Sequence, residues 1–285
     1  EQQLSASDQS LLWRGTDQLA GGLPVALRQI PADQPELQAA LRQLWPRLQG
    51  VLHPQVPRLG AAIQAQEGLW LVREWQAGRT YQLLLQARAE RQLVFGAGEV
   101  LLLLRQLLPV LAVLHSQELV HGDLCPANLL RRDSDGLPVL LDFGLVAGTA
   151  AATPGYAPPE RVRVADPEPS PPEPWMDLHA LGVVALVLLS GEEPAQLLDP
   201  VTLAWRWPAS LDAVPAMQEV LERLLSPSAE DRFPSAAAAL QALQQVPMPD
   251  STGPVARADR TVVLVPPPAG SQPQASPATA AVPAR

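Results

Sequence analysis

The order of apolar and polar positions predicts a β-rich segment at the start of the chain. Short apolar runs separated by turn residues indicate strands, and they lie at 11–13, 24–27, 59–64 and 69–74. Residues 20–22 (Ala-Gly-Gly) supply the turn of a hairpin within 11–30. Residues 35–44 instead carry apolar side chains at helical spacing, and Pro46 is expected to end or kink that helix. Gly78 marks a break after the last strand.

Helical patterns dominate the rest of the chain. A long apolar helix is expected from about Gly96 to Gln117, and short apolar runs follow at 119–120, 129–130 and 139–141. After Pro158 the pattern is helical to about Gln245, interrupted by proline-rich loops. We therefore expect an α+β protein in two lobes, with a small β-rich N-lobe over residues 1–75 and a mainly helical C-lobe over residues 76–247.

The last part of the chain, residues 248–285, has a different composition. Pro, Ala, Ser, Gly and Thr dominate it, with one apolar island at 261–265. Such a segment buries too little apolar surface to offset the entropy lost on ordering. We therefore expect a disordered tail that acts as a tether.

Composition and charge exclude several classes of protein. The net charge of −9 argues against a surface for nucleic acid or anionic membrane, which would need clustered positive charge. The most apolar runs, 100–114 and 178–189, are shorter than the roughly 18–20 residues of a membrane span, so we expect buried helices and no span in this chain. A single cysteine, Cys125, rules out an internal disulfide, and the first ten residues carry no secretory signal. We expect a cytoplasmic protein, and because the chain starts with Glu, one that is processed or part of a longer protein.

Several polar residues in the middle of the chain have the spacing of a phosphoryl-transfer site. His121-Gly122-Asp123 precedes Asn128, and Asp142 follows after a turn and a strand. Phosphoryl transfer from ATP needs a carboxylate to orient the attacking hydroxyl and oxygen ligands to hold Mg²⁺. Asp123 is the candidate base, and Asn128 and Asp142 are candidate metal ligands with hard oxygen donors. Asn128 is the only asparagine of the chain, which makes its position informative.

The pattern His-Gly-Asp-Leu-x-Pro-x-Asn, followed by Asp142-Phe143-Gly144, resembles the catalytic core of the eukaryotic-type serine/threonine protein kinases of bacteria. The resemblance implies a protein-kinase-like fold, ATP and Mg²⁺ as cofactors, and a protein substrate or protein partner. His121, Phe143 and Gly144 would be structural residues of this core. Small-molecule kinases of the aminoglycoside phosphotransferase type share the His-Gly-Asp, Asn and Asp set, and they remain a distant alternative.

Features of the helical half favour a protein kinase over a small-molecule kinase. Residues 153–160 resemble the peptide-binding end of an activation segment, so Thr153 joins the candidate catalytic residues. Asp177 matches the helix acid that in the family braces the catalytic loop from beneath. Arg232 matches the arginine that in the family forms a buried ion pair with the position of Glu160.

Four departures from the family pattern affect residues that in the family bind the phosphates of ATP. Val25-Ala26-Leu27-Arg28 resembles the strand that in the family ends in a phosphate-holding lysine. Arg28 keeps the positive charge, but its guanidinium is wide and planar where the lysine ammonium is compact. The chain contains no lysine, since all twenty basic residues are arginine. The glycine-rich loop should fall near residues 7–10, which contain no glycine, and the helix glutamate should fall near Gln43 or Leu44, neither of which is acidic. Cys125 stands where the family usually carries a lysine that touches the γ-phosphate.

Arg73 lies just before the apparent hinge, at the position that in the family lines the back of the adenine pocket. It either points to solvent as an ordinary strand residue, or it replaces missing charge near Asp142 or blocks the pocket. The hinge at Glu74 and Gln76 should still offer its backbone to adenine. Gly122 stands where the family has an arginine for a phosphorylated loop, so regulation through the short segment 142–160 is not expected.

The resemblance thus implies a serine/threonine protein kinase of slow or impaired activity, with Arg28 or Arg73 in the role of the lysine. The alternative is a pseudokinase that acts as a scaffold by binding a partner.

Overall fold

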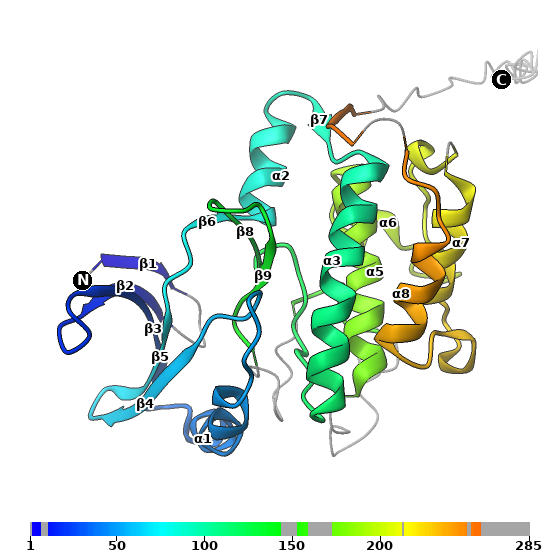
Figure 1. Cartoon of the computed structure of the whole chain (residues 1–285). Coiled ribbons are helices and arrows are strands. Elements are labelled where there is room, and N and C mark those ends of the chain that lie inside the picture. Colours follow the sequence, from blue (N-terminus) through cyan, green and yellow to red (C-terminus); the bar gives the residue numbers. More distant parts are fainter. Residues whose placement is uncertain are drawn as a thin grey trace, which may run out of the picture.

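The computed structural model of the chain describes residues 2–6, 11–143, 153–158, 173–212, 214–249 and 252–257. These residues form a sheet-rich lobe and a mainly helical lobe (Figure 1). The predicted α+β fold, with a small β-rich N-lobe and a mainly helical C-lobe, is therefore confirmed.

The N-lobe is built on a five-stranded antiparallel sheet with the order β1-β2-β3-β5-β4. Its strands are β1 (Gln2–Ala6), β2 (Leu11–Asp17), β3 (Leu23–Pro31), β4 (Leu59–Ala65) and β5 (Gly68–Glu74). Strands β2 and β3 form the predicted hairpin and pair along their length. Successive side chains of a strand point to opposite faces, and along β5 this buries Leu69, Leu71 and Arg73 on one face.

Helix α1 (Pro35–Gln49) packs against this sheet beside β4. Its large buried side chains recur every three or four residues: Leu37, Leu41, Trp45 and Leu48. We predicted that Pro46 ends or kinks the helix, but the helix continues to Gln49. An interior proline costs about 3 kcal/mol, while burial of Trp45 and Leu48 contributes about 1.5–3 kcal/mol for each side chain. Packing against the sheet therefore keeps the last turn helical.

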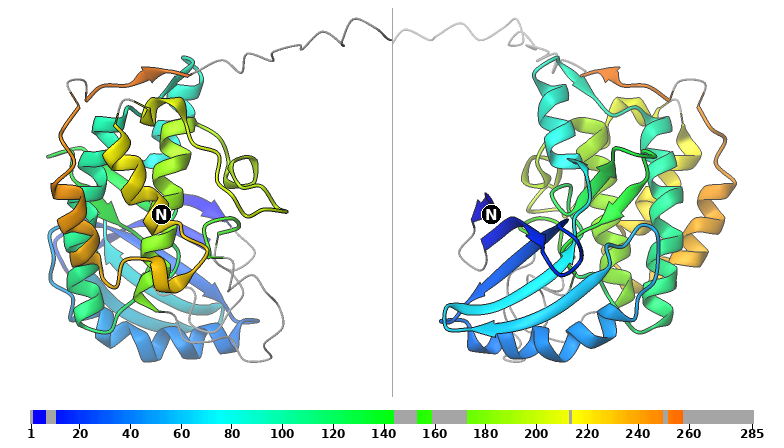
Figure 2. Two further views of the ribbon diagram at one scale, coloured as in Figure 1. Left: turned by 90° about the vertical axis from the view of Figure 1, so that its right-hand side faces the viewer. Right: turned by 60° about the vertical axis from the view of Figure 1, so that its left-hand side comes forward.

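The C-lobe is a bundle around one buried helix, α5 (Pro174–Ser190), in which every residue from 176 to 189 is buried. Around it lie α3 (Ala97–Ser116), α6 (Pro194–Leu197), α7 (Pro215–Leu224) and α8 (Ala236–Gln244). The lobe also contains α2 (Tyr81–Ala89) and short 3₁₀ turns at Ala209–Leu211 and Ala229–Asp231. Helix α3 contacts both α5 and α8 (Figure 2). By length and composition α3 could cross a membrane, but most of its residues are buried, as we predicted for a core helix.

A small three-stranded sheet connects the two lobes. Its strands are β6 (Gly78–Thr80), β8 (Leu129–Arg132) and β9 (Pro138–Leu140), in the order β6-β8-β9. Gly78 was expected to mark a break, but it begins β6 instead. A Cβ atom on Gly78 would lie 2.2 Å from the carbonyl oxygen of Arg131, so the close strand pairing requires glycine here. The turns before β8 and after β9 carry the candidate site residues.

The prediction of disorder from residue 248 is wrong for residues 252–257. Strand β10 (Val255–Ala256) pairs antiparallel with β7 (Leu93–Val94) at the far end of the C-lobe. The Arg257 amide also donates to the Gln92 carbonyl at 2.9 Å. Backbone groups, which any residue can supply, form these bonds. The island at 261–265 lies outside the described residues.

Candidate active site

The loop from His121 to Asn128 is held from beneath by Asp177, which lies in the first turn of α5. The Asp177 carboxylate is 1% exposed. One oxygen, Oδ1, accepts from the Gly122 amide at 2.8 Å, and the other, Oδ2, accepts from the His121 amide at 2.9 Å and contacts Nε2 of His115 at 2.9 Å. A buried carboxylate is costly unless its oxygens are satisfied. These three contacts satisfy it and fix the loop backbone to the core of the C-lobe.

Asp123, the candidate base, is held by two neighbours. Its Oδ1 accepts from the Thr153 amide at 2.9 Å and from the Thr153 hydroxyl at 2.7 Å. Its Oδ2 accepts from Nδ2 of Asn128 at 2.8 Å, and the same Nδ2 donates to the Asp123 carbonyl at 2.8 Å. The structure thus brings together three of the predicted site residues, and it fixes the direction of the carboxylate.

Cys125 lies beside this group, with its sulfur 3.5 Å from the Thr153 hydroxyl. The side chain is buried, and burial together with the charge of Asp123 raises the pKa of the thiol. The thiol is therefore neutral at pH 7. No positive charge stands at the position where the resemblance places a lysine.

Asp142 follows β9 and faces the same loop. The His121 ring contacts the Leu141 carbonyl at 2.8 Å through Nε2 and stacks obliquely on Phe143, with ring centroids 4.7 Å apart. The Leu141 amide also donates to the Asn128 carbonyl at 2.8 Å. Asp142 itself has a left-handed backbone conformation with φ of 57°, which Asp tolerates better than most residues. Such a conformation persists where the surroundings enforce it, and it is common in functional sites.

Two arginines from the N-lobe sheet converge on Asp142. Nη1 of Arg28 and Nε of Arg73 each lie 3.4 Å from the same oxygen, Oδ1. Burial alone would raise the pKa of Asp142, but the charges of Arg73 and Arg28 outweigh it and hold the pKa below its ordinary value. Burial lowers the pKa of Arg28, and Asp142 opposes this change. The solvent-facing reading of Arg73 is wrong, because the residue is only 8% exposed and its guanidinium lies at Asp142.

The arginines and Asp142 line a small cavity of about 20 Å³, whose wall is completed by Trp45, Pro57, Leu59, Leu71, Leu140 and Phe143. Helix α1 contributes only Trp45 to this wall. At the positions expected for the helix glutamate, Gln43 is exposed and Leu44 is half-buried. Among the described residues, Asp142 is therefore the only acid that lines the cavity, and it forms an ion pair with Arg28.

Mg²⁺ would need an oxygen site with net negative charge, and this arrangement does not provide one. Both contacts of the Asn128 amide nitrogen are to oxygens, which leaves its carbonyl oxygen as a candidate ligand. Asp142, however, already faces two guanidinium groups, so Asp142, Arg28 and Arg73 together carry a charge of about +1. Within the described part of the chain, no group of three or more His, Cys, Asp or Glu side chains is placed so that it could hold a metal ion. As they are arranged, these residues do not fit a divalent cation at Asp142.

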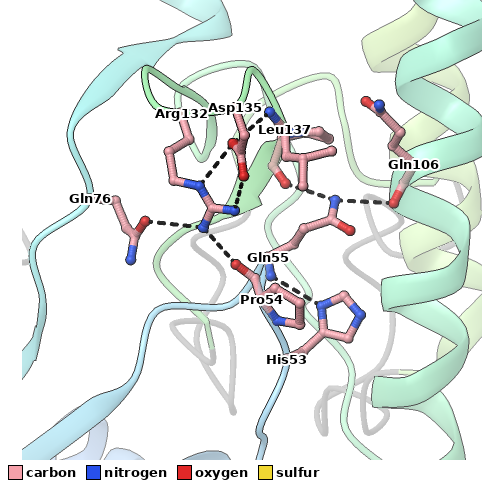
Figure 3. Close-up of polar contacts among 9 residues, drawn as sticks. His53, Pro54, Gln55, Gln76, Gln106, Arg132, Asp135 and Leu137 are labelled. Carbon is pink, nitrogen blue, oxygen red and sulfur yellow. Dashed lines mark hydrogen bonds and ion pairs between the residues drawn. The ribbon is translucent and has the colours of Figure 1, made fainter.

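Behind the cleft, a network of polar contacts that the sequence did not reveal joins the hinge to both lobes (Figure 3). The Arg132 guanidinium donates to Asp135 at 2.6 and 3.0 Å, to the Pro54 carbonyl at 2.7 Å and to the Gln76 side chain at 3.5 Å. Buried Gln55 donates through Nε2 to the carbonyls of residues 138 and 106, at 2.8 and 3.2 Å. Half of these six acceptor atoms are backbone carbonyls, which leave no residue pattern in a sequence.

The remaining predicted positions are partly described. Glu74 is exposed, and its amide donates to the Arg58 carbonyl at 2.8 Å. Arg232 is buried, donates through Nε to the Ser226 carbonyl at 2.7 Å, and lies over the Trp175 ring at 4.9 Å. The positions outside the described residues are those of the expected glycine-rich loop and of the segment after Phe143: 7–10, Gly144 and Glu160.

A sheet-rich lobe and a helical lobe, with an acid-bearing loop and a second acid after a short hairpin between them, define a protein kinase fold. The protein kinase domain family model matches residues 23–244, and the chain therefore belongs to the protein kinase family. Its relatives place it among the eukaryotic-type serine/threonine kinases of bacteria, as the sequence predicted.

Two of these relatives are cyanobacterial. Serine/threonine-protein kinase C of Synechocystis is 33% identical over 236 residues, which are 74% of this chain and 42% of that protein. Serine/threonine-protein kinase PknA of Nostoc is 32% identical over 207 residues, which are 67% of this chain and 35% of that protein. The chain thus spans less than half the length of these relatives.

Two solved structures share the fold. The kinase domain of Mycobacterium tuberculosis PknI aligns with a TM-score of 0.67 at 23% identity, covering 85% of this chain and 93% of that one. The apo form of PpkA-294 aligns with a TM-score of 0.65 at 18% identity, covering 85% of this chain and 94% of that one. At these identities the likeness establishes the fold.

Proposed function

We propose that the chain is a serine/threonine protein kinase domain that binds ATP between its lobes and transfers the γ-phosphoryl group slowly to protein hydroxyls. The observation that carries this proposal is the geometry of Asp123. Its carboxylate is oriented by Thr153 and Asn128, on a loop fixed by Asp177. A fixed carboxylate is what an attacking hydroxyl needs for orientation and proton acceptance.

The slow rate in this proposal follows from the charges around Asp142. Efficient phosphoryl transfer depends on positive charge at the transferring phosphate. Arg28 and Arg73 supply two charges, but both also face Asp142, and Cys125 supplies none. We further propose a protein in the cytoplasm that acts on other proteins, with its single cysteine reduced.

A second candidate function, a pseudokinase that works by binding a partner, is favoured by the same arginines. Because both guanidiniums already lie on Asp142, the domain can hold its cleft together without nucleotide or metal. In this case the fold would be a scaffold, and Asp123 would have no reaction to support.

Phosphate transfer to a generic basic protein from γ-labelled ATP separates the two functions. The full chain is compared with Asp123→Asn and with the control Glu219→Gln, which changes an exposed acid on α7. A kinase predicts slow transfer that falls by about 10²-fold or more in Asp123→Asn and is unchanged in Glu219→Gln. Transfer that survives Asp123→Asn would refute the assignment of the base. Absence of transfer in the wild type, with thermal stabilisation by ATP, would establish the pseudokinase.

A further inference from the structure

Arg73 is an unusual residue for the buried face of a strand. It is 8% exposed, it follows Leu69 and Leu71 on the same face of β5, and it pairs in register with Ala26 of β3. A charged side chain is rarely buried without a good partner. Among the described residues its Nε has no hydrogen-bond partner, and its ion pair with Asp142 is long at 3.4 Å.

The ion pair is long compared with the strongest contacts that guanidinium groups make. Charge-assisted N–H···O bonds are usually about 2.7–2.9 Å long. Arg88 reaches 2.7 Å to each oxygen of Glu99 in this same chain, which shows what a bidentate pair looks like here. Arg73 and Arg28 instead share one oxygen of Asp142 at 3.4 Å. Among the described residues, the Nε donor of Arg73 therefore remains available for a stronger acceptor.

The charge of the cluster indicates what kind of acceptor this is. Among the residues that line the largely apolar cavity, two guanidiniums against one carboxylate leave about one positive charge. A divalent cation at Asp142 would add to that charge and be repelled, whereas an anion would neutralise it. Phosphate oxygens suit guanidinium donors because the planar fork can bind two of them at once.

We propose that Arg28 and Arg73 form an anion site that takes the polyphosphate of a metal-free nucleotide, with the guanidinium of Arg73 in the place of the divalent cation at Asp142. The proposal rests on the proposed function only in assuming that a nucleotide enters the cleft. Arg73 comes from the strand just before the hinge, so its side chain lies between the segment next to adenine and Asp142. In this role it is a binding residue that selects metal-free nucleotide over its magnesium complex.

Equilibrium binding of ATP to the full chain, measured by calorimetry in excess EDTA and again with Mg²⁺, tests this directly. Arg73→Met keeps the apolar stem and removes the charge. The matched control is Arg91→Met, which changes an exposed arginine in the turn after α2. Inorganic tripolyphosphate, added as a competitor in EDTA, tests whether the polyphosphate is the recognised part. Circular dichroism and a thermal scan confirm that each variant is folded.

The proposal predicts that the wild type binds ATP in EDTA at least as tightly as with Mg²⁺, and that tripolyphosphate competes. Arg73→Met should weaken binding in EDTA by tenfold or more, since a hydrogen bond to a charged group is lost. The same variant should gain affinity when Mg²⁺ is added, and Arg91→Met should match the wild type.

Three other outcomes overturn the proposal, and they separate it from the proposed function. Binding by the wild type only with Mg²⁺ would refute the anion site and leave the kinase function standing. Binding by Arg73→Met but not by the wild type would mean that Arg73 blocks the pocket. Binding by neither protein under either condition would refute the nucleotide site itself, and with it the proposed function.

Discussion

Replacing Asp177 by asparagine should lower the stability of the whole domain, because one buried carboxylate satisfies three donors. The substitution keeps the shape of the side chain but removes its charge. If the amide oxygen takes the place of Oδ2, it retains neutral bonds to His121 and His115, and the amide nitrogen faces the Gly122 amide without a bond. A stranded buried donor costs about 1–3 kcal/mol, and each bond to a charged acceptor is about 1 kcal/mol stronger than a neutral one. The expected loss is about 3–5 kcal/mol.

This loss is measurable by urea unfolding followed through tryptophan fluorescence. With a slope of about 2 kcal/mol per molar urea, the midpoint should fall by roughly 1.5–2.5 M. Glu219→Ala removes an exposed carboxylate from α7 and should leave the midpoint nearly unchanged, within about 0.5 kcal/mol. A midpoint for Asp177→Asn equal to that of Glu219→Ala would refute the reasoning that the loop is fixed through this carboxylate.

Three further predictions test other parts of the fold. Burial raises the pKa of Tyr81 to about 12 and also raises the pKa of Tyr156, so spectrophotometric titration should show no tyrosine ionising near pH 10 in the folded chain and both ionising there in strong urea. The stability that these neutral tyrosines contribute is present below pH 10 and is lost as the pH rises above it. Ionisation near pH 10 in the folded chain would contradict their burial. Buried Cys125 should react with iodoacetamide at pH 7.5 only after unfolding, and rapid labelling of the native chain would show that its thiol is accessible. Gln55→Ala should lower the free energy of unfolding by about 1–3 kcal/mol, because it leaves two carbonyls unpaired. Gln18→Ala, in an exposed turn, should leave the free energy of unfolding unchanged. Equal unfolding midpoints for the two variants would contradict this role of Gln55.

Local chemistry explains why part of the site could be predicted from the sequence. His121, Asp123 and Asn128 lie within one short loop, so their spacing alone brings them together. Asp177 is distant in sequence, and its role was implied by the resemblance to the kinase family; the structure shows that its carboxylate accepts from two amides of this loop. Local spacing together with the family pattern was sufficient for these positions.

Arg73 shows where such reasoning stops. Its place on the buried face could be read from the alternation of Leu69, Leu71 and Arg73, yet the general preference of arginine for solvent points the other way. The outcome is decided by Asp142, which lies on a different element far along the chain. No single-sequence pattern specifies that contact.

Contacts made by backbone groups also could not be predicted from the sequence. Strand β10 pairs with β7 through main-chain groups in a segment whose composition indicates disorder. Gln55 and Arg132 bind carbonyl oxygens in the connection behind the cleft, and any residue can supply a carbonyl. At Pro46, propensity predicted a helix end or a kink, but the helix continues to Gln49 with Trp45 and Leu48 buried.

The most direct test of the charge arrangement at Asp142 is a crystal structure of the full chain grown with ATP and Mn²⁺, since manganese gives an anomalous signal and takes the same oxygen ligands as magnesium. The account predicts nucleotide in the cleft, the Arg73 guanidinium on its phosphates, and no manganese peak at Asp142. In crystals of Arg73→Met, a peak should appear there. A manganese ion bound to Asp142 and Asn128 in the wild type, with Arg73 turned away, would contradict the account.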